Sequence, residues 1–433
     1  MYRPKRSSLR RRMLRGAGAL AAAAAIAVAA AACGSSSSSG SSSSAGTSAS
    51  AGASSSSGSN ASQASQTGKC TARALLITNL TGVGAQNGAS DAPAWKLAAS
   101  RINAAGGVNG CKLVVDIANE ASDPTKDVPL AEQYTSQHTY AEVAAIDLGG
   151  ASAVPYLMRR KILSVTSDCA GEGLDTKANP YFFDTCPGLS PATLAATTAA
   201  IKAGHTKIGA VVQNNSLGAN AAIGIQQAAK KAGGQVVDVE KVDPTAVDTT
   251  AAVTRLQNAG AQAVVFELFG AVVGHFLDNV ATSGYNVPLY GGLGTFATNI
   301  PAIVTNPKDY QNLLVVGPAV ATTPSRPAVL DYIAGLKKTP GGQTPLSNNL
   351  STSGQAYDDL ILFAWAANQA HSLNSDTLKK FLETHGTTAV PGLLNAPSTG
   401  YTPADHMFTP NYLAVAKSGP LNEGRLKRLS FAH

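Results

Sequence analysis

Residues 101–116 read RINAAGGVNGCKLVVD and mark a transition from helix to strand. Apolar side chains within residues 95–102 recur at the spacing of one helix face, and Asp91 is a candidate N-cap for that helix. Gly106 and Gly107 favour the left-handed backbone conformation that ends a helix. The apolar run that follows resembles a buried strand, so the stretch predicts a helix, a glycine joint and a strand.

The same order of features returns at residues 232–238, which read AGGQVVD. Other apolar runs alternate with longer amphipathic segments. We predict strands at residues 74–78, 112–117, 143–147, 162–165, 208–212, 235–239, 263–267 and 313–316. This alternation is typical of βαβ units and predicts an α/β fold with parallel sheets.

The length of the chain after residue 70 predicts two lobes. Residues 70–433 exceed the length at which single hydrophobic cores usually divide, which is about 250–300 residues. No second low-complexity linker divides this part of the sequence. We therefore expect two lobes that are joined by several close crossings, with a cleft between them in which a small molecule binds.

The net charge of +7 arises at the N-terminus. Seven of the 33 basic residues and none of the 26 acidic residues lie in residues 1–32, so the rest of the chain is formally neutral. A neutral remainder lacks the positive excess that would indicate binding to nucleic acid, and we expect no nucleic-acid partner.

The N-terminal region predicts export and anchoring. Residues 1–32 combine a basic stretch with an apolar run that is too short to span a membrane, as in a secretory signal peptide. The small residues before Cys33 resemble the lipobox of bacterial lipoproteins, which implies a lipid on Cys33 and attachment to the outer face of the cytoplasmic membrane. The arginines within residues 10–15 also resemble a twin-arginine signal, so the export route stays open. Small polar residues dominate residues 33–69, which predicts a flexible tether; the alternative is a leader without an anchoring role.

Four further cysteines lie in the part expected to fold: Cys70, Cys111, Cys169 and Cys186. An even number in an exported chain, without C-x-x-C spacing, indicates disulfides and not a metal site. Cys70 and Cys111 each precede a predicted strand, which would place them at the same edge of neighbouring parallel strands. We predict the bridges Cys70–Cys111 and Cys169–Cys186, while four cysteines permit three pairings.

A glycine-rich segment at residues 82–88, GVGAQNG, follows the first predicted strand, as a dinucleotide-binding loop would. Its third glycine position is occupied by Asn87, so we expect no nucleotide cofactor. Backbone N–H groups at the start of the next helix, together with Gln86 and Asn87, suit an anionic or polar solute.

Catalytic sequence motifs are missing: the chain has no G-x-S-x-G, H-E-x-x-H or G-x-x-x-x-G-K-[ST] pattern. Asp358 and Asp359 precede an apolar run at residues 360–367. We interpret them as the first residues of a helix, where the helix dipole favours acids, and not as a catalytic pair.

The motif RINAAGGVNG, the following Lys112-Leu113 and the later Asp123-Pro124 resemble the periplasmic branched-chain amino-acid-binding family, the type I solute receptors of ABC importers. Further similar segments lie at residues 181–185, 248–256, 354–360 and 403–406, and the resemblance extends over nearly all of residues 70–415.

This resemblance implies two Rossmann-like lobes, three crossings between them, and a small-molecule solute that is closed in the cleft and delivered to ABC permease subunits. It places the first lobe at residues 70–189 plus 293–398 and the second lobe at residues 190–292 plus 399–433. We expect a monomer.

The resemblance also implies ligand-binding residues in both lobes. Ser152, Ser167, Asp168 and Cys169 match the loops that hold a ligand carboxylate in the family. In this chain Asn87 and Leu217 stand at positions where the family often has aromatic side chains, and the family's acid near residues 291–294 is absent. The remaining candidates are Glu267, Phe269, Thr295 and Tyr357.

Glu267 has two interpretations. A buried Glu267 would replace the missing acid as the partner of a cationic group, because an unpaired buried charge is costly. Alternatively, Glu267 caps the end of a strand in solvent.

Three functions follow from these observations. The first is capture of a small polar solute, such as an amino acid, an amide or a related organic acid, for import. The second is a ligand-sensing regulatory module of the same fold. The third is a secreted hydrolase, which would need a nucleophile and a base in the cleft, with Ser152 or Asp168 as the residues to test; we expect no enzyme activity.

Overall fold

The computed structural model describes residues 70–146, 152–169, 171–304, 306–408 and 412–432. These residues belong to one compact unit. The predicted signal peptide at residues 1–32, the lipidation site at Cys33 and the predicted tether at residues 33–69 lie outside the described residues.

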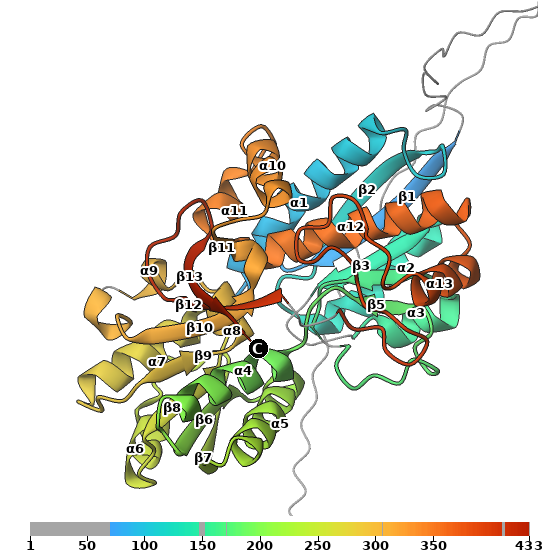
Figure 1. Cartoon of the computed structure of the whole chain (residues 1–433). Coiled ribbons are helices and arrows are strands. Elements are labelled where there is room, and N and C mark those ends of the chain that lie inside the picture. The colour runs from blue at the N-terminus through green and yellow to red at the C-terminus, as the bar shows by residue number, and fades with distance from the viewer. Residues whose placement is uncertain (1–69, 147–151, 170, 305, 409–411, 433) are drawn as a thin grey trace, which may run out of the picture. The chain divides into compact units, whose positions relative to one another are not determined.

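A three-stranded parallel sheet forms the centre of the first lobe, in the order β2-β1-β3 (Figure 1). Its strands are β1 (Thr71–Thr78), β2 (Lys112–Asn119) and β3 (Glu142–Ile146). Residues 74–77 of β1 are fully buried, as expected for a central strand of a parallel sheet with helices on both faces. A short parallel pair, β4 (Ser164–Thr166) and β5 (Phe182–Asp184), continues beside β3 through a bridge between Glu142 and Leu163.

An eight-stranded sheet forms the centre of the second lobe, in the order β11-β13-β12-β10-β9-β8-β6-β7. The five strands from β6 to β10 run parallel, and β12 runs antiparallel to both β10 and β13. The bounds are β6 (Lys207–Gln213), β7 (Gln235–Val242), β8 (Ala263–Glu267), β9 (Leu289–Gly291), β10 (Leu313–Pro318), β11 (Thr322–Thr323), β12 (Leu413–Lys417) and β13 (Leu426–Phe431). The predicted α/β class with two parallel-rich sheets is confirmed.

Helices pack on the faces of both sheets (Figure 1). They are α1 (Ala85–Ala104), α2 (Asp127–Gln137), α3 (Val154–Arg160), α4 (Leu189–Lys202), α5 (Ser216–Lys231), α6 (Thr250–Asn258), α7 (Ala271–Thr282), α8 (Leu293–Ala297), α9 (Ile300–Ile303), α10 (Pro327–Leu336), α11 (Gln343–Ser347), α12 (Leu350–Ala370) and α13 (Ser375–Thr384). Within the described ranges, none of them has the length and apolar character needed to cross a membrane.

Helix α1 begins at Ala85, six residues before the predicted N-cap. Asp91 lies inside this helix, is 1% exposed, and accepts a hydrogen bond from Thr78 Oγ1 at 3.1 Å. Burial raises the pKa of Asp91 to about 8, although the hydrogen bond acts in the opposite direction. The N-cap prediction was wrong because the first turns of α1 are small and polar, so the apolar pattern starts later than the helix. The predicted end is confirmed, since Gly106 and Gly107 have φ angles of 110° and 82°.

The chain leaves the first lobe between β5 and α4, at residues 184–189, and returns to it between β11 and α10, at residues 323–327. It enters the second lobe again at β12, which starts at Leu413. The return to the first lobe differs from the predicted boundary at residue 293, because β10 pairs with β9 and β12, and β11 pairs with β13, which keeps the chain in the second lobe as far as Thr323. The predicted boundary at residue 399 differs as well. The backbone N–H of Phe408 donates to the carbonyl of Asp184 at 3.0 Å, which holds this return segment on the first lobe.

Both predicted disulfides form, between Cys70 and Cys111 and between Cys169 and Cys186. Cys70 and Cys111 precede the neighbouring strands β1 and β2, as the sequence predicts. The second bridge ties Cys169, in the first lobe, to Cys186, which lies within the crossing at residues 184–189.

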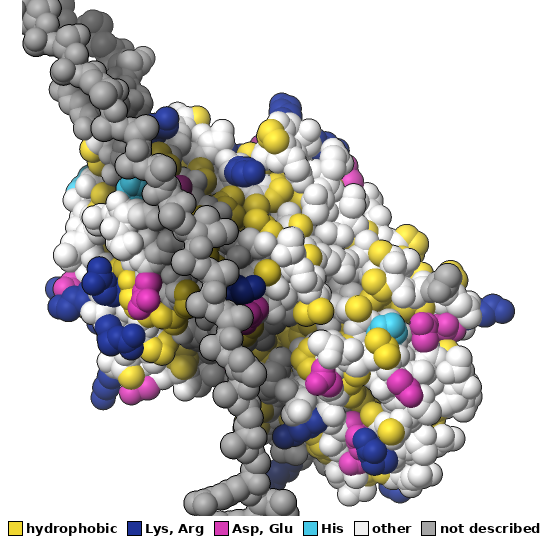
Figure 2. Space-filling view, turned by 180° about the vertical axis from the view of Figure 1, so that it is seen from behind, with side chains coloured by type: hydrophobic (Ala, Val, Ile, Leu, Met, Phe, Trp, Pro, Cys, Tyr) yellow, Lys and Arg dark blue, Asp and Glu magenta, His cyan; other side chains and the backbone are white. Residues whose placement is uncertain are grey.

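Charged side chains of both signs are interspersed on the face shown in Figure 2. This distribution agrees with the equal numbers of acidic and basic residues after residue 32.

Candidate functional site

A pocket of about 180 Å³ lies between the lobes, at the carboxyl ends of β1, β6, β7 and β8. This edge of a parallel sheet is where ligands usually bind in α/β proteins, because the loops that follow the strands meet there. The first lobe contributes Val83, Gly84 and Gln86, and the second lobe contributes Gln213, Pro244, Thr245, Ala246, Val247, Phe269, Gly270, Ala271, Val272 and His275.

Most of the pocket wall is apolar. Val83 and Val247, from opposite lobes, are 52% and 75% exposed, so each presents an apolar side chain to solvent at the pocket. Gln213 is buried, and its Nε2 donates to the carbonyl of Phe269 at 3.1 Å, which fixes the loop after β8. Among the described lining residues there is no Asp, Glu, Lys or Arg.

Two helices begin at this pocket, one from each lobe. Helix α1 follows Gly84 and helix α7 follows Gly270. Neither helix has a side-chain cap or an acidic residue in its first turn. The N–H groups of Ala85 and Val273 already donate to the carbonyls of Gly82 and Gly270, at 3.2 and 3.1 Å. The helix dipoles still give both helix starts a partial positive charge, which favours an anionic group between them.

Glu267 is the last residue of β8 and is fully buried. Its Oε1 accepts a hydrogen bond from the backbone N–H of Gly294 at the start of α8. Burial raises the pKa of Glu267 to about 8, against the lowering effect of hydrogen bonds from Gly294 and Leu293. The interpretation of Glu267 as a solvent-exposed strand cap is therefore wrong. Its carboxyl group is held against α8, and Glu267 is not among the residues that line the pocket.

Ser167 belongs to a buried network around Asp359 of α12. Asp359 Oδ2 accepts from Ser167 Oγ at 3.0 Å, and its Oδ1 accepts from Thr185 Oγ1 at 2.5 Å.

Asp358, the neighbour of Asp359, accepts hydrogen bonds from the backbone N–H groups of Leu394 and Asn395 at 2.8 and 2.9 Å. Both acids lie in the middle of α12, so the prediction that they open a helix was wrong. The helix starts earlier because Asn349 caps it by accepting from the N–H of Ser351.

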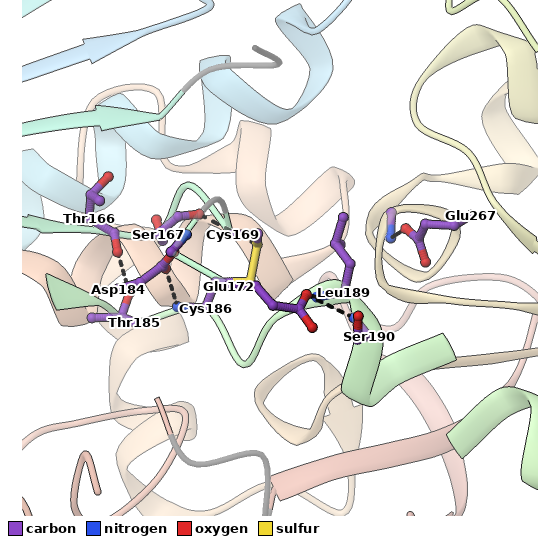
Figure 3. The surroundings of a disulfide bond; sticks show 12 residues. Thr166, Ser167, Cys169, Glu172, Asp184, Thr185, Cys186, Leu189, Ser190 and Glu267 are labelled. Atoms are coloured by element: carbon purple, nitrogen blue, oxygen red, sulfur yellow. Dashed lines mark hydrogen bonds between the residues drawn. A yellow bond between two sulfur atoms is a disulfide. The ribbon is translucent and has the colours of Figure 1, made fainter. Parts of the chain in front are cut away.

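The disulfide between Cys169 and Cys186 lies beside this network (Figure 3). In the loop that it closes, Glu172 Oε2 accepts hydrogen bonds from the backbone N–H groups of Leu189 and Ser190, both at 3.1 Å. Glu172 therefore connects a loop of the first lobe to the start of α4, the first helix of the second lobe. Asp168, next to Cys169, is 5% exposed.

The other predicted residues contact protein groups as well. Ser152 Oγ donates to Asp127 at 2.5 Å, Leu217 is buried in the core under α5, and Thr295 is fully buried in α8. Tyr357 is buried between α12 and α1, where its hydroxyl accepts from Arg101 at 2.9 Å. Arg101 lies fifteen residues along α1 from Gln86, which corresponds to about 22 Å of helix. Tyr357, which contacts Arg101, is therefore not among the residues that line the pocket at Gln86.

Of the predicted ligand-binding residues, Gln86 and Phe269 line the pocket. Asn87 follows Gln86 in α1, and its side chain lies outside what the structure describes. Gln213, His275 and the loop at residues 244–247 were not predicted. Gln213 ends β6 and residues 244–247 follow β7, so the position of ligands at the carboxyl ends of strands would have indicated them. His275 lies within α7, and its place at the pocket depends on the packing of that helix. Within the described ranges, no group of three or more His, Cys, Asp or Glu residues is placed to hold a metal ion.

A family model described as periplasmic binding protein matches residues 71–420. Leu/Ile/Val-binding protein homolog 3 of Brucella melitensis is 28% identical over 264 residues, which are 60% of this chain and 71% of that protein.

Two solved structures show the same fold. A branched-chain amino acid ABC transporter protein from Thermus thermophilus with bound valine has a TM-score of 0.74 at 16% identity and covers 84% of this chain and 97% of its own. A solute-binding protein of an ABC transporter from R. palustris, in complex with 4-hydroxybenzoate, has a TM-score of 0.69 at 17% identity and covers 84% of this chain and 98% of its own.

Proposed function

Because the chain belongs to the periplasmic binding protein family, we propose that it captures a small solute in the pocket between its lobes and delivers it to an ABC importer. The observation that carries this proposal is that both lobes line one pocket at the carboxyl ends of their strands. A solute that touches both lobes stabilises the closed arrangement by its higher affinity for that state. The relatives from Thermus thermophilus and R. palustris, which hold valine and 4-hydroxybenzoate, support a small organic solute.

Thermal-shift screening of the purified protein tests capture. We expect that at least one member of a library of amino acids, amides and organic acids raises the melting temperature, because a ligand that binds only the folded state stabilises it by mass action. A pocket variant, Ala271→Trp, should lose this shift, since Ala271 is an exposed residue in the pocket wall. Ala251→Trp is the matched control, because Ala251 is likewise exposed near the start of a helix and does not line the pocket. Capture is contradicted if neither the library nor a cell extract shifts the melting temperature.

Cys33 anchors the protein in this proposal. The apolar run before Cys33 and the small polar segment after it support removal of residues 1–32 and attachment through a lipid on Cys33, at the outer face of the cytoplasmic membrane. Metabolic labelling with a fatty acid should mark the wild-type protein and not Cys33→Ser, and the variant should leave the membrane fraction. Equal membrane retention of both proteins would contradict the anchor.

A further inference from the structure

We infer that Glu172 is a positioning residue that braces the first crossing between the lobes and thereby raises the affinity of the pocket for its solute. The first crossing is the segment at residues 184–189, which joins β5 to α4. The inference rests on the proposed function, and it concerns the lobe movement that encloses the solute.

The first part of this crossing is fixed to the first lobe. The backbone N–H of Thr185 donates to the carbonyl of Thr166 at 2.8 Å, beside the paired strands β4 and β5. A disulfide joins the next residue, Cys186, to Cys169 in the loop after β4 (Figure 3). The crossing therefore moves with the first lobe as far as Cys186.

The second lobe begins shortly after this fixed part. Leu189 is the first residue of α4, a helix that packs against α5 and against β8, β9 and β10 of the eight-stranded sheet. Pro187 and Gly188 remain between Cys186 and Leu189. Gly188 has a φ of 82°, in a region that glycine enters readily. A rotation of α4 relative to the first lobe is therefore taken up at Pro187 and Gly188, because hinge motions concentrate in a few residues at the ends of elements.

Glu172 spans these two residues from a loop of the first lobe. The backbone N–H of Gly171 donates to Asp184 Oδ2 at 2.9 Å, which holds that loop against β5. The Glu172 carboxylate reaches from this loop to the start of α4, where it accepts from the N–H groups of Leu189 and Ser190, both at 3.1 Å (Figure 3). Hydrogen bonds to a carboxylate are stronger than neutral ones, and its charge suits the start of a helix. The first helix of the second lobe is thus capped from the first lobe.

A rotation at Gly188 would break this cap. It would carry Leu189 and Ser190 away from Glu172, since Glu172 belongs to the lobe on the other side of the pivot. The arrangement described here keeps both hydrogen bonds and also places both lobes on the pocket. Glu172 therefore stabilises the arrangement in which one solute touches both lobes. A larger fraction of molecules in that arrangement raises the apparent affinity for the solute.

Distances between spin labels on the two lobes test the brace without a solute. Labels at Lys96→Cys in α1 and Lys230→Cys in α5 occupy exposed positions of the first and the second lobe, in a chain that also carries Cys33→Ser. Glu172→Ala should show a distance population that the chain with Glu172 lacks, because the two hydrogen bonds no longer favour one arrangement.

Two further variants are the controls for this measurement. Glu172→Gln keeps an oxygen that can accept from both N–H groups. Asn374→Ala removes a helix cap that lies within the first lobe, where Asn374 Oδ1 accepts from the N–H of Thr377 at 3.1 Å. Both controls should keep the distances of the unmodified lobes. Unchanged distances in Glu172→Ala, or an equal shift in either control, would overturn the inference.

Affinity for the solute is the second readout. Calorimetric titration uses the member of the amino acid, amide and organic acid library that raises the melting temperature of the wild type. Glu172→Ala should bind it about threefold or more weaker, and both controls should bind it as the wild type does. If neither the library nor the extract contains a binder, the proposed function fails, while the label distances still decide the brace. Wild-type affinity in Glu172→Ala would overturn the link between the brace and solute binding.

Discussion

The carbonyl oxygen of Val83 and the α-carbon of Gly270 approach each other from opposite lobes, and a Cβ atom on Gly270 would lie 3.2 Å from that oxygen. Gly270 also has a φ of 71°, which side chains rarely adopt. The lobes therefore meet beside the pocket at a residue that has no side chain.

Gly270→Ala should weaken solute binding, because the added methyl group would crowd Val83 when the lobes close. Gly270 combines this φ with a ψ of −148°, close to a region that only glycine normally adopts, so the variant should lose about 1–3 kcal/mol of folding free energy. Gly260→Ala is the matched control, since Gly260 has a φ of 69° and a Cβ there would meet no atom within 4 Å. Both variants should lose stability in urea unfolding, and only Gly270→Ala should lose affinity. Equal affinity in the two variants would show that this approach has no part in closure.

The stability of the protein should fall as the pH rises from about 4.5 to about 8. Burial raises the pKa of Glu267 from 4.5 to about 8, so in this range the folded protein keeps a proton that the unfolded chain has released. The free energy of unfolding then decreases with pH, by up to about 1.4 kcal/mol for each unit of pKa difference. The buried Asp91 and Asp184, with pKa values raised to about 8 and about 7, act in the same direction.

Glu267→Gln removes one of these protons while leaving an oxygen that can accept from Gly294. Urea unfolding at several pH values should show a smaller decrease for this variant than for the wild type. An identical pH dependence would mean that Glu267 is ionised in the folded protein near neutral pH.

Loss of the disulfide between Cys169 and Cys186 should destabilise the protein by about 3 kcal/mol, because the unfolded chain regains the freedom of a loop of this length. The two cysteines are separated by 17 residues, and Cys70 and Cys111 by 41. Replacing the second pair with serine should therefore cost more, about 4 kcal/mol. Chemical unfolding of the two double variants measures both losses, and a smaller loss for the longer loop would contradict the loop-entropy argument.

Tyr357→Phe should lower stability and leave solute affinity unchanged. The substitution removes a hydroxyl that accepts from Arg101 at 2.9 Å between α1 and α12, a contact worth about 1 kcal/mol. Titration with a bound solute and urea unfolding distinguish the two effects. A clear loss of affinity at unchanged stability would restore Tyr357 as a ligand-binding residue.

Local patterns predicted the strands that lie inside the sheets. The apolar runs of β1, β6 and β8 are continuous and buried, so composition alone indicates them. β5 and β9 are three residues long, and β13 carries several exposed side chains, so their assignment depends on neighbouring strands. Such pairing is not visible in one segment of sequence.

The acids of the first lobe show a second limit. Asp91 and Asp359 look like residues of helix starts, yet each is buried inside a helix and paired with a hydroxyl group from another element. Partners that are distant in the sequence, such as Ser167 for Asp359, override the local preference. The same limit applies to the pocket, where Gln86 and Phe269 could be selected from loop positions while the closeness of His275 depends on the packing of α7.

A crystal structure of the protein, grown with a solute that raises its melting temperature, would locate the bound solute. We predict that the solute lies between Gln86 and Phe269, in contact with both lobes. A solute bound elsewhere, or in contact with one lobe only, would contradict it.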